Sequence, residues 1–167
     1  MNIQDLSNHF DPVDIEWRTQ QCGWKDGKPW AMVLAYITNR AIMDRLDEVC
    51  TPFGWQNEFR IDSDGAIMCG ISIHSENGWI TKWDGADATD IEAIKGGRSN
   101  AMKRAGVQWG IGRYLYNLDV TFAEISMDWP PKEEKPLWTK HYDKKEKKAF
   151  FWKKPNLPTW AQPEVEK

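Results

Sequence analysis

Residues 94–116, IKGGRSNAMKRAGVQWGIGRYLY, combine five glycines with five cationic side chains and hold no acidic residue. Shortly before them, Thr89-Asp90-Ile91-Glu92 matches a capping box, in which a threonine and a glutamate three residues later satisfy the first free amides of a helix. We therefore expect a long helix to begin there. Apolar residues at helical spacing predict the face that packs on the core: Ile91, Ile94, Ala101, Met102, Ala105 and Trp109.

The rest of this predicted helix is basic and rich in glycine. Lys95, Ser99 and Lys103 recur every four residues and form a ridge beside the apolar face, with Arg104 further round the helix. A glycine inside a helix costs about 1 kcal/mol relative to alanine. So many glycines indicate close approach to a neighbouring helix, another subunit or a ligand backbone, and a helix broken near Gly110 is the alternative.

Upstream, the pattern predicts a strand and a shorter helix. The pair Asp26-Gly27 favours a hairpin turn, after which a strand is expected over 30–37. Thr38 is a suitable N-cap for a helix that runs to about Cys50. Three apolar residues at helical spacing form its expected buried stripe: Ile42, Leu46 and Val49.

Between the two helices, alternating apolar residues predict three strands, over 55–62, 66–75 and 79–84. Short connections, one of them containing the Asn77-Gly78 pair, make an antiparallel meander with one packed and one partly open face. A further strand is expected over 120–126. The expected fold class is α+β, with the meander packed on the long helix.

The chain has 11 tryptophans among 167 residues, which is unusual for any soluble domain. We expect Trp55, Trp79, Trp83 and Trp109 in the sheet–helix core, and Trp17, Trp24 and Trp30 in an N-terminal segment that packs on this core or on a neighbour. From Trp129 onward, prolines and lysines interleave with tryptophans that no regular pattern explains. The expected domains are therefore a core over 1–128 and a basic C-terminal tail over 129–167, extended or weakly ordered alone.

Charge is unevenly distributed along the chain. The formal net charge is −3, yet residues 132–154 hold 9 lysines against 4 acids, and residues 1–131 hold 12 Lys/Arg against 19 Asp/Glu. A locally basic surface on an acidic body can attract a polyanion such as nucleic acid. The alternative for any one charged run is an ordinary solvated face.

The motifs of common enzyme classes are missing. There is no Walker phosphate-binding loop, nucleophile elbow or HExxH zinc motif. The three cysteines and three histidines lack ligand spacing, so we expect reduced thiols in a cytosolic protein and neither a metal nor a cofactor.

No apolar run is long enough for a transmembrane helix, and the polar residues 1–11 are not expected to form a secretory signal. Asp84, Asp87 and Asp90 could hold a divalent ion, as in a nuclease, although a strand end and a helix N-terminus explain them more simply.

Residues 94–116 resemble the signature of the Rad52/22 family of single-strand annealing proteins, in which KG is followed by A-x-KRA and then by a glycine-spaced motif ending in YLY. Residues 15–18 (IEWR) resemble the family's opening motif, and residues 38–49 with Gly54-Trp55 resemble its first long helix and strand. The resemblance covers about residues 6–126. The small size favours the phage or prophage branch.

This resemblance implies a non-catalytic, ring-forming protein that holds single-stranded DNA in a basic groove. It would anneal complementary strands without ATP, in homologous recombination and double-strand break repair. The implied DNA-binding residues are Arg40, Lys95, Arg98, Lys103 and Arg104, with Lys82 as a candidate for a second, outer DNA site. Two family positions depart from the pattern: a basic residue after the Lys-Arg pair falls on Val107, and a lysine of the outer site falls near Glu76.

Several alternatives remain open from sequence alone. Arg40 could pair with Asp44 one turn later, Lys103 and Arg104 could be a solvated flank, and Arg113 could bind a neighbouring subunit. The protein could also bind single-stranded DNA or RNA, or protect ends, without annealing, or it could be a metal-dependent nuclease. We expect it in the bacterial cytoplasm with the nucleoid and not in a membrane, with a single-strand-binding protein as a candidate partner of the tail.

Overall fold

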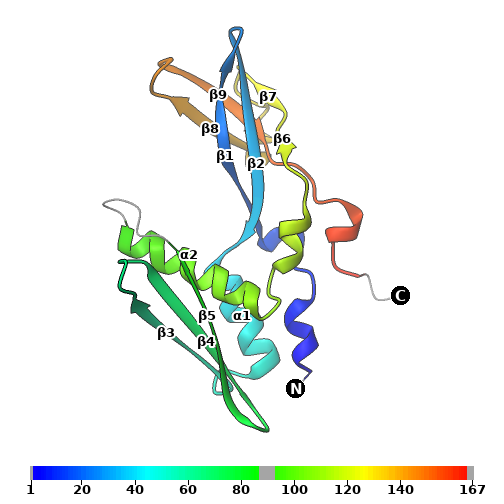
Figure 1. Ribbon diagram of the computed structural model, residues 1–167. Helices are drawn as coiled ribbons and strands as arrows, with labels where there is room; N and C mark the ends of the chain where they lie inside the picture. Colours follow the sequence, from blue (N-terminus) through cyan, green and yellow to red (C-terminus); the bar gives the residue numbers. More distant parts are fainter. Residues whose placement is uncertain (1, 87–92, 165–167) are drawn as a thin grey trace. The chain divides into compact units, whose positions relative to one another are not determined.

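The computed structural model describes residues 2–86 and 93–164, and the side chains of residues 93–95 lie outside that description (Figure 1). The chain forms two compact units. One contains residues 1–15, 37–117 and 162–167, and the other contains residues 16–36 and 118–161. The expected boundary at residue 128 therefore falls inside the second unit and does not separate the two. Among the described helices, none is long and apolar enough to cross a membrane.

The first unit contains α1, Asn39–Cys50, as the sequence predicts. Thr38 is its N-cap: the hydroxyl oxygen accepts a hydrogen bond from the Ala41 amide at 3.2 Å. The helix ends at Cys50, and the next residue, Thr51, adopts a φ of 62° just before Pro52. Its buried face is formed by Ala41, Ile42, Leu46 and Cys50. Cys50 thus replaces the expected Val49 at the end of the stripe.

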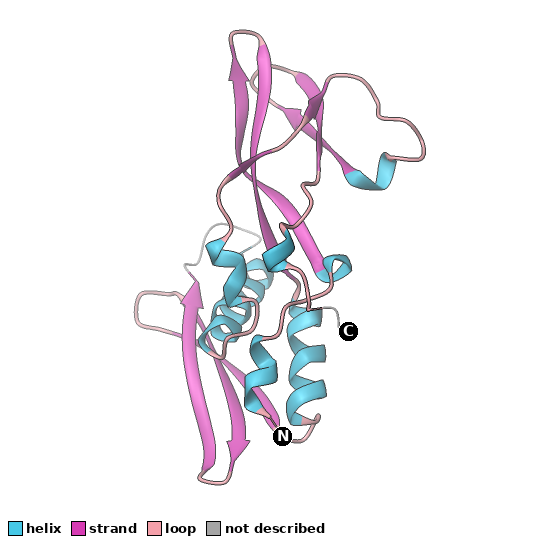
Figure 2. Ribbon diagram, turned by 90° about the vertical axis from the view of Figure 1, so that its right-hand side faces the viewer, coloured by secondary structure: helices cyan, strands magenta, loops and turns pink. Residues whose placement is uncertain are grey.

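The meander of the first unit also forms as predicted. Strands β3 (Trp55–Ile61), β4 (Ile67–Ser75) and β5 (Gly78–Ala86) make an antiparallel sheet in the order β3-β4-β5. In Figures 1 and 2, α2 lies along one face of this sheet, where it contacts β4 and β5. The β4 side chains on that face are buried: Ile67, Cys69, Ile71 and Ile73.

Two tryptophans expected in the sheet–helix core lie on the opposite face of the sheet. Trp83 pairs with Gly70, and Trp79 pairs with His74, so both alternate with the residues that face α2. A Cβ added to Gly70 would lie 2.6 Å from the Trp83 ring, which therefore covers the glycine directly. The Arg60 guanidinium lies over that ring, 4.5 Å from its centroid. The core prediction was wrong for this pair because the strand register, which sequence does not give, decides which alternate set is buried.

The second helix, α2, spans Ala93–Gln108. The expected capping box at 89–92 lies outside the described residues. Ala101, Met102 and Ala105 are buried, which confirms that part of the expected stripe. Gly97 brings the helix close to the sheet, since an added Cβ would lie 2.6 Å from Ile67 Cδ1. The helix ends at Gln108, before Gly110, whose φ is +94°, so the alternative of a break near Gly110 is also present. Short 3-10 helices complete the unit: Ile3–Ser7, Pro12–Asp14 and Arg113–Asn117.

The second unit consists of two three-stranded sheets. The first contains β1 (Ile15–Lys25), β2 (Lys28–Ile37) and β6 (Thr121–Phe122), in the order β1-β2-β6. The second contains β7 (Ile125–Ser126), β8 (Trp138–Asp143) and β9 (Lys148–Lys153), in the order β7-β9-β8. Asp26 and Gly27 both have positive φ, 51° and 76°, as a type I′ hairpin turn requires. Short 3-10 helices span Lys135–Leu137 and Thr159–Ala161.

The segment expected to be a weakly ordered tail supplies half of the core of this unit. Phe150 and Trp152 of β9 are 0% and 2% exposed and pack with Ala31 and Val33 of β2. Trp17, Cys22, Trp24, Ala123 and Ile125 pack around them, partly buried. The tail prediction therefore differs from the structure. Phe150 and Trp152 face the core, whereas Phe151 points to the other face and packs against Trp129, so the continuous apolar run gives no visible alternation.

Candidate nucleic-acid interface

One cationic site lies where the C-terminal half of α2 meets β5. The Arg104 guanidinium Nε is 2.9 Å from Asp84 Oδ1, and the Gln108 amide donates to Asp84 Oδ2 at 2.9 Å. The Gly85 backbone amide donates to Asp84 Oδ1 at 2.8 Å. The Asp84 side chain is only 18% exposed, whereas that of Arg104 is 54% exposed. Asp84 therefore fixes the guanidinium from the protein side and leaves its remaining donors available to solvent or to a phosphate.

The electrostatics of Asp84 agree with this geometry. Burial by itself would raise the pKa of Asp84, but hydrogen bonds from Gln108, Arg104 and the Gly85 amide outweigh it, and its pKa is lowered. The carboxylate consequently stays ionised at neutral pH and holds Arg104 in place. Lys103, the other member of the predicted pair, is half-buried on the same helix.

Arg98 and Arg104 face different edges of the sheet. The Arg98 guanidinium lies 5.7 Å from the centroid of the Phe59 ring on β3, whereas Arg104 pairs with Asp84 on β5. Because β3 and β5 are the two outer strands of the sheet, the structure does not bring these two arginines together. Both side chains are exposed.

Lys82 is engaged at the end of α2. Its ammonium donates to the Gln108 carbonyl oxygen at 2.9 Å and lies 4.3 Å from the centroid of the Trp109 ring. Trp109 is itself held by a hydrogen bond from its indole Nε1 to the Ile71 carbonyl, at 2.9 Å. A cation at a helix C-terminus is stabilising, so Lys82 has a structural task besides its predicted place in a second DNA site.

Arg113 occupies the same helix end. Its guanidinium donates to the carbonyl oxygens of Val107, at 2.7 and 2.9 Å, and Gln108, at 3.0 Å. Two cations, Lys82 and Arg113, thus satisfy the last carbonyls of α2 from two directions. This local role is one that the sequence did not reveal for Arg113.

Arg40 lies in the first turn of α1 and is exposed. Within the described residues it makes neither the alternative pair with Asp44 nor any other ion pair. Arg45 is the engaged arginine of this helix: it pairs with Glu48 at 3.3 Å and donates to the backbone carbonyl oxygens of Asp5 and Asn8. Helix α1 packs on α2, where Ile42 lies beside Gly106.

Three predicted site residues lie wholly or partly outside the described part of the structure. They are Lys95, whose side chain is not described, and Asp87 and Asp90 of the acidic group. The third member, Asp84, is bound to Arg104 and Gln108. Over residues 2–86 and 93–164, no cluster of three or more His, Cys, Asp or Glu side chains could hold a metal ion. The structure does join Cys22 Sγ and His141 Nε2, 3.2 Å apart in the second unit, which linear spacing did not indicate.

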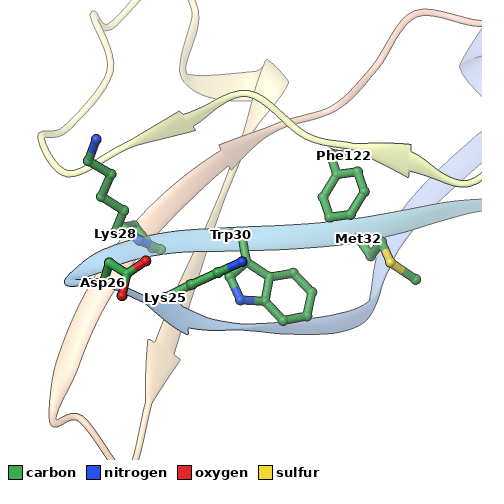
Figure 3. Close-up of a pocket in the computed structure, with 7 residues that line it drawn as sticks. Lys25, Asp26, Lys28, Trp30, Met32 and Phe122 are labelled. Atoms are coloured by element: carbon green, nitrogen blue, oxygen red, sulfur yellow. The ribbon is translucent and has the colours of Figure 1, made fainter.

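The second unit carries a groove beside its first sheet, of about 600 Å³. Figure 3 shows Lys25, Asp26 and Lys28 at the hairpin end of the groove, and Phe122 and Met32 at the other end. Trp30 lies between them, with its ring centroid 6.2 Å from that of Phe122. Lysines beside accessible aromatic rings are typical of surfaces that bind single-stranded nucleic acid.

Comparisons with known proteins identify a family and relatives for this chain. The model of the Rad52/22 family of double-strand break repair proteins matches residues 2–68 and 63–134. The single-stranded DNA-binding protein DdrA of Deinococcus radiodurans is 36% identical over 173 residues, which cover all of this chain and 72% of that protein. The DdrA protein of Deinococcus deserti is 32% identical over 156 residues, covering 86% of this chain and 65% of that protein. No solved structure matches the chain significantly.

Proposed function

The chain belongs to the Rad52/22 family, and from that membership we propose that it binds single-stranded DNA and anneals complementary strands in homologous recombination and double-strand break repair. The observation that carries the proposal is the Arg104 guanidinium, fixed by Asp84 and exposed on α2 next to Lys103. A positioned guanidinium binds phosphate oxygens through charge-assisted hydrogen bonds. Such contacts ignore base identity, as annealing of any sequence requires.

The proposed DNA-binding residues are Arg40, Lys95, Arg98, Lys103 and Arg104, with Lys82 in a second site. One subunit offers few phosphate contacts. We therefore propose that identical subunits assemble into a ring, so that weak contacts repeat along one strand and add in avidity. The reaction needs neither ATP nor a catalytic residue, because base pairing drives it once the repulsion between strands is reduced.

The wider setting is also a proposal. The chain spans 72% and 65% of the two DdrA proteins. We therefore propose single-stranded DNA binding for this chain by analogy with them. We place the protein in the cytoplasm with DNA, and we keep a single-strand-binding protein as a proposed partner of residues 129–167.

A second candidate function is binding without annealing. The two DdrA relatives are named for single-stranded DNA binding and not for annealing. A protein that coats and protects single strands would use the same cations on α2. The two functions differ in whether the bases of the bound strand remain accessible to a second strand.

An annealing assay separates the candidates. A labelled oligonucleotide and its complement are mixed with the full chain in the presence of EDTA and without nucleotide. We expect the protein to accelerate duplex formation. Protection of the strand from a nuclease without faster annealing would support the binding-only function, and cleavage that appears only when divalent metal is restored would support a nuclease.

A further inference from the structure

We propose that the β7-β9-β8 sheet of the second unit carries a separate site for single-stranded DNA, in which Trp129 stacks on a base and Lys135 and Lys140 contact the flanking phosphates. The inference rests on the proposed function, single-stranded DNA binding, and adds a site distinct from the cations of α2. It also assigns a function to basic residues of the C-terminal region.

Trp129 is an exposed ring held on a firm support. It is 62% exposed, whereas Phe151 beneath it is only 4% exposed. The two ring centroids are 4.5 Å apart, with an angle of 45° between the planes. Phe151 belongs to β9, whose neighbours Phe150 and Trp152 form the core of the unit. The indole is thus fixed from below and presents apolar surface to solvent, as a stacking platform requires.

Two lysines surround this platform. The ammonium of Lys135 is 5.3 Å from the Trp129 ring centroid, and that of Lys140 is 5.9 Å away. Both side chains are exposed, and within the described residues neither forms an ion pair. Exposed cation–π contacts are weaker than the stacking of a base on an aromatic ring. The lysines can therefore leave the ring for phosphates when a base arrives.

A neighbouring cluster on the same unit shows what a purely structural arrangement looks like. The Lys153 ammonium lies 5.5 Å from the Trp138 ring, but it also pairs with Glu134 at 3.0 Å. The Trp138 indole donates to the same carboxylate at 3.2 Å. These bonds lower the pKa of Glu134, the hydrogen bond from Lys153 contributing most. Lys153 is paired with an acid there, whereas Lys135 and Lys140 beside Trp129 form no ion pair within the described residues.

The surrounding charge favours a polyanionic occupant. Residues 132–154 hold 9 lysines and 4 acids, so the sheet lies in an anion-attracting region. An acidic peptide would use the lysines and leave the ring idle, and a lipid surface would need a larger apolar face. Single-stranded DNA supplies regularly spaced phosphates and flat bases together, which matches both components of the site.

The test compares Trp129→Leu with Trp160→Leu, a matched substitution of another tryptophan of this unit that is half exposed. Affinity is measured for a thymidine oligonucleotide and for an abasic oligonucleotide of the same length. We expect Trp129→Leu to weaken thymidine binding about five-fold or more and to leave abasic binding unchanged. Trp160→Leu should leave both affinities unchanged, and Lys135→Ala with Lys140→Ala should weaken both.

Leucine keeps Phe151 covered, and Trp129→Phe, which retains a stacking ring, should restore most of the thymidine affinity. If Trp129→Leu proves unstable in thermal unfolding, the affinities of Trp129→Phe and of Lys135→Ala with Lys140→Ala are compared with wild type instead. Equal affinities of the Trp129→Leu and wild-type proteins for the thymidine oligonucleotide would overturn the inference while the proposed function stands. A wild-type protein that binds neither oligonucleotide would instead overturn the proposed function.

Discussion

Asp84 and Arg104 are 20 residues apart in the chain, yet the carboxylate Oδ1 and the guanidinium Nε are 2.9 Å apart. The contact joins β5 to α2 and gives the arginine of the proposed DNA site a defined orientation. It also places an acidic group beside a cation that is proposed to meet phosphate. The carboxylate is the more buried partner, so the exposed side of the pair is positive.

The first prediction concerns the pH dependence of stability. The pKa of Asp84 in the folded protein lies below its ordinary value near 3.8. Its stabilising contribution is therefore complete above pH about 4 and is lost as the pH falls through the lowered value. Because Arg104 is largely exposed, we expect Asp84→Asn to reduce stability by less than about 1 kcal/mol at pH 7. Thermal unfolding should show the gap from wild type closing below pH about 4, and Asp44→Asn is the control. A gap that is constant over pH would contradict the assignment.

Lys82 gives a second prediction. Loss of its bond to the Gln108 carbonyl should lower the free energy of unfolding by about 0.3–1 kcal/mol in Lys82→Ala. Thermal denaturation measures this change. We expect the same variant to reduce DNA affinity less than substitution of Lys103 and Arg104 does. A large loss of affinity without loss of stability would show that Lys82 serves DNA alone.

Two adjacent glycines of α2 test how closely the helix approaches the sheet. At Gly96 an added Cβ meets nothing within 4 Å, whereas at Gly97 it would lie 2.6 Å from Ile67 Cδ1. Gly96→Ala should stabilise the protein by up to about 1 kcal/mol through helix propensity. Gly97→Ala has the same propensity gain but must displace Ile67, so it should be less stable than Gly96→Ala in chemical denaturation. Equal stabilities would contradict the close packing of α2 on β4.

The C-terminal region should be essential to the second unit. Phe150 is fully buried in its core, so Phe150→Ala should reduce stability by about 3–5 kcal/mol. Phe122→Ala, at a position that is 65% exposed, should have a much smaller effect. Denaturant titration distinguishes the two. A small effect of Phe150→Ala would instead support the predicted weakly ordered tail over residues 129–167.

Local signals in the sequence predict much of the secondary structure of the first unit. The Thr38 cap, the Asn77-Gly78 turn and the stripe through Ala101 and Ala105 each depend on neighbours within a few residues. The same holds for the Asp26-Gly27 turn of the second unit. Such features follow from backbone preference and periodicity, which single sequences contain.

The missed features all depend on long-range contacts. The burial of Trp152 requires β9 to meet β2, more than 100 residues earlier in the chain. The Asp84–Arg104 pair forms because the register of β5 against β4 turns Asp84 toward α2. The same register turns Trp83 away from the helix. Neither composition nor spacing carries that information, so the sequence predicts a tail for the basic C-terminal region and does not reveal the support of Arg104 by Asp84.

The most direct test is the salt dependence of single-strand affinity and the annealing rate of Lys103→Ala with Arg104→Ala. We expect slower annealing, weaker binding and a salt slope reduced by at least about 1.4, the change for two lost phosphate contacts on a single strand. The oligomer should remain intact, and Lys103→Arg, which keeps the charge and leaves the Asp84–Arg104 pair in place, should retain most of the activity. An intact oligomer of the alanine variant with wild-type annealing rate and unchanged salt slope would contradict the assignment of the DNA site to α2.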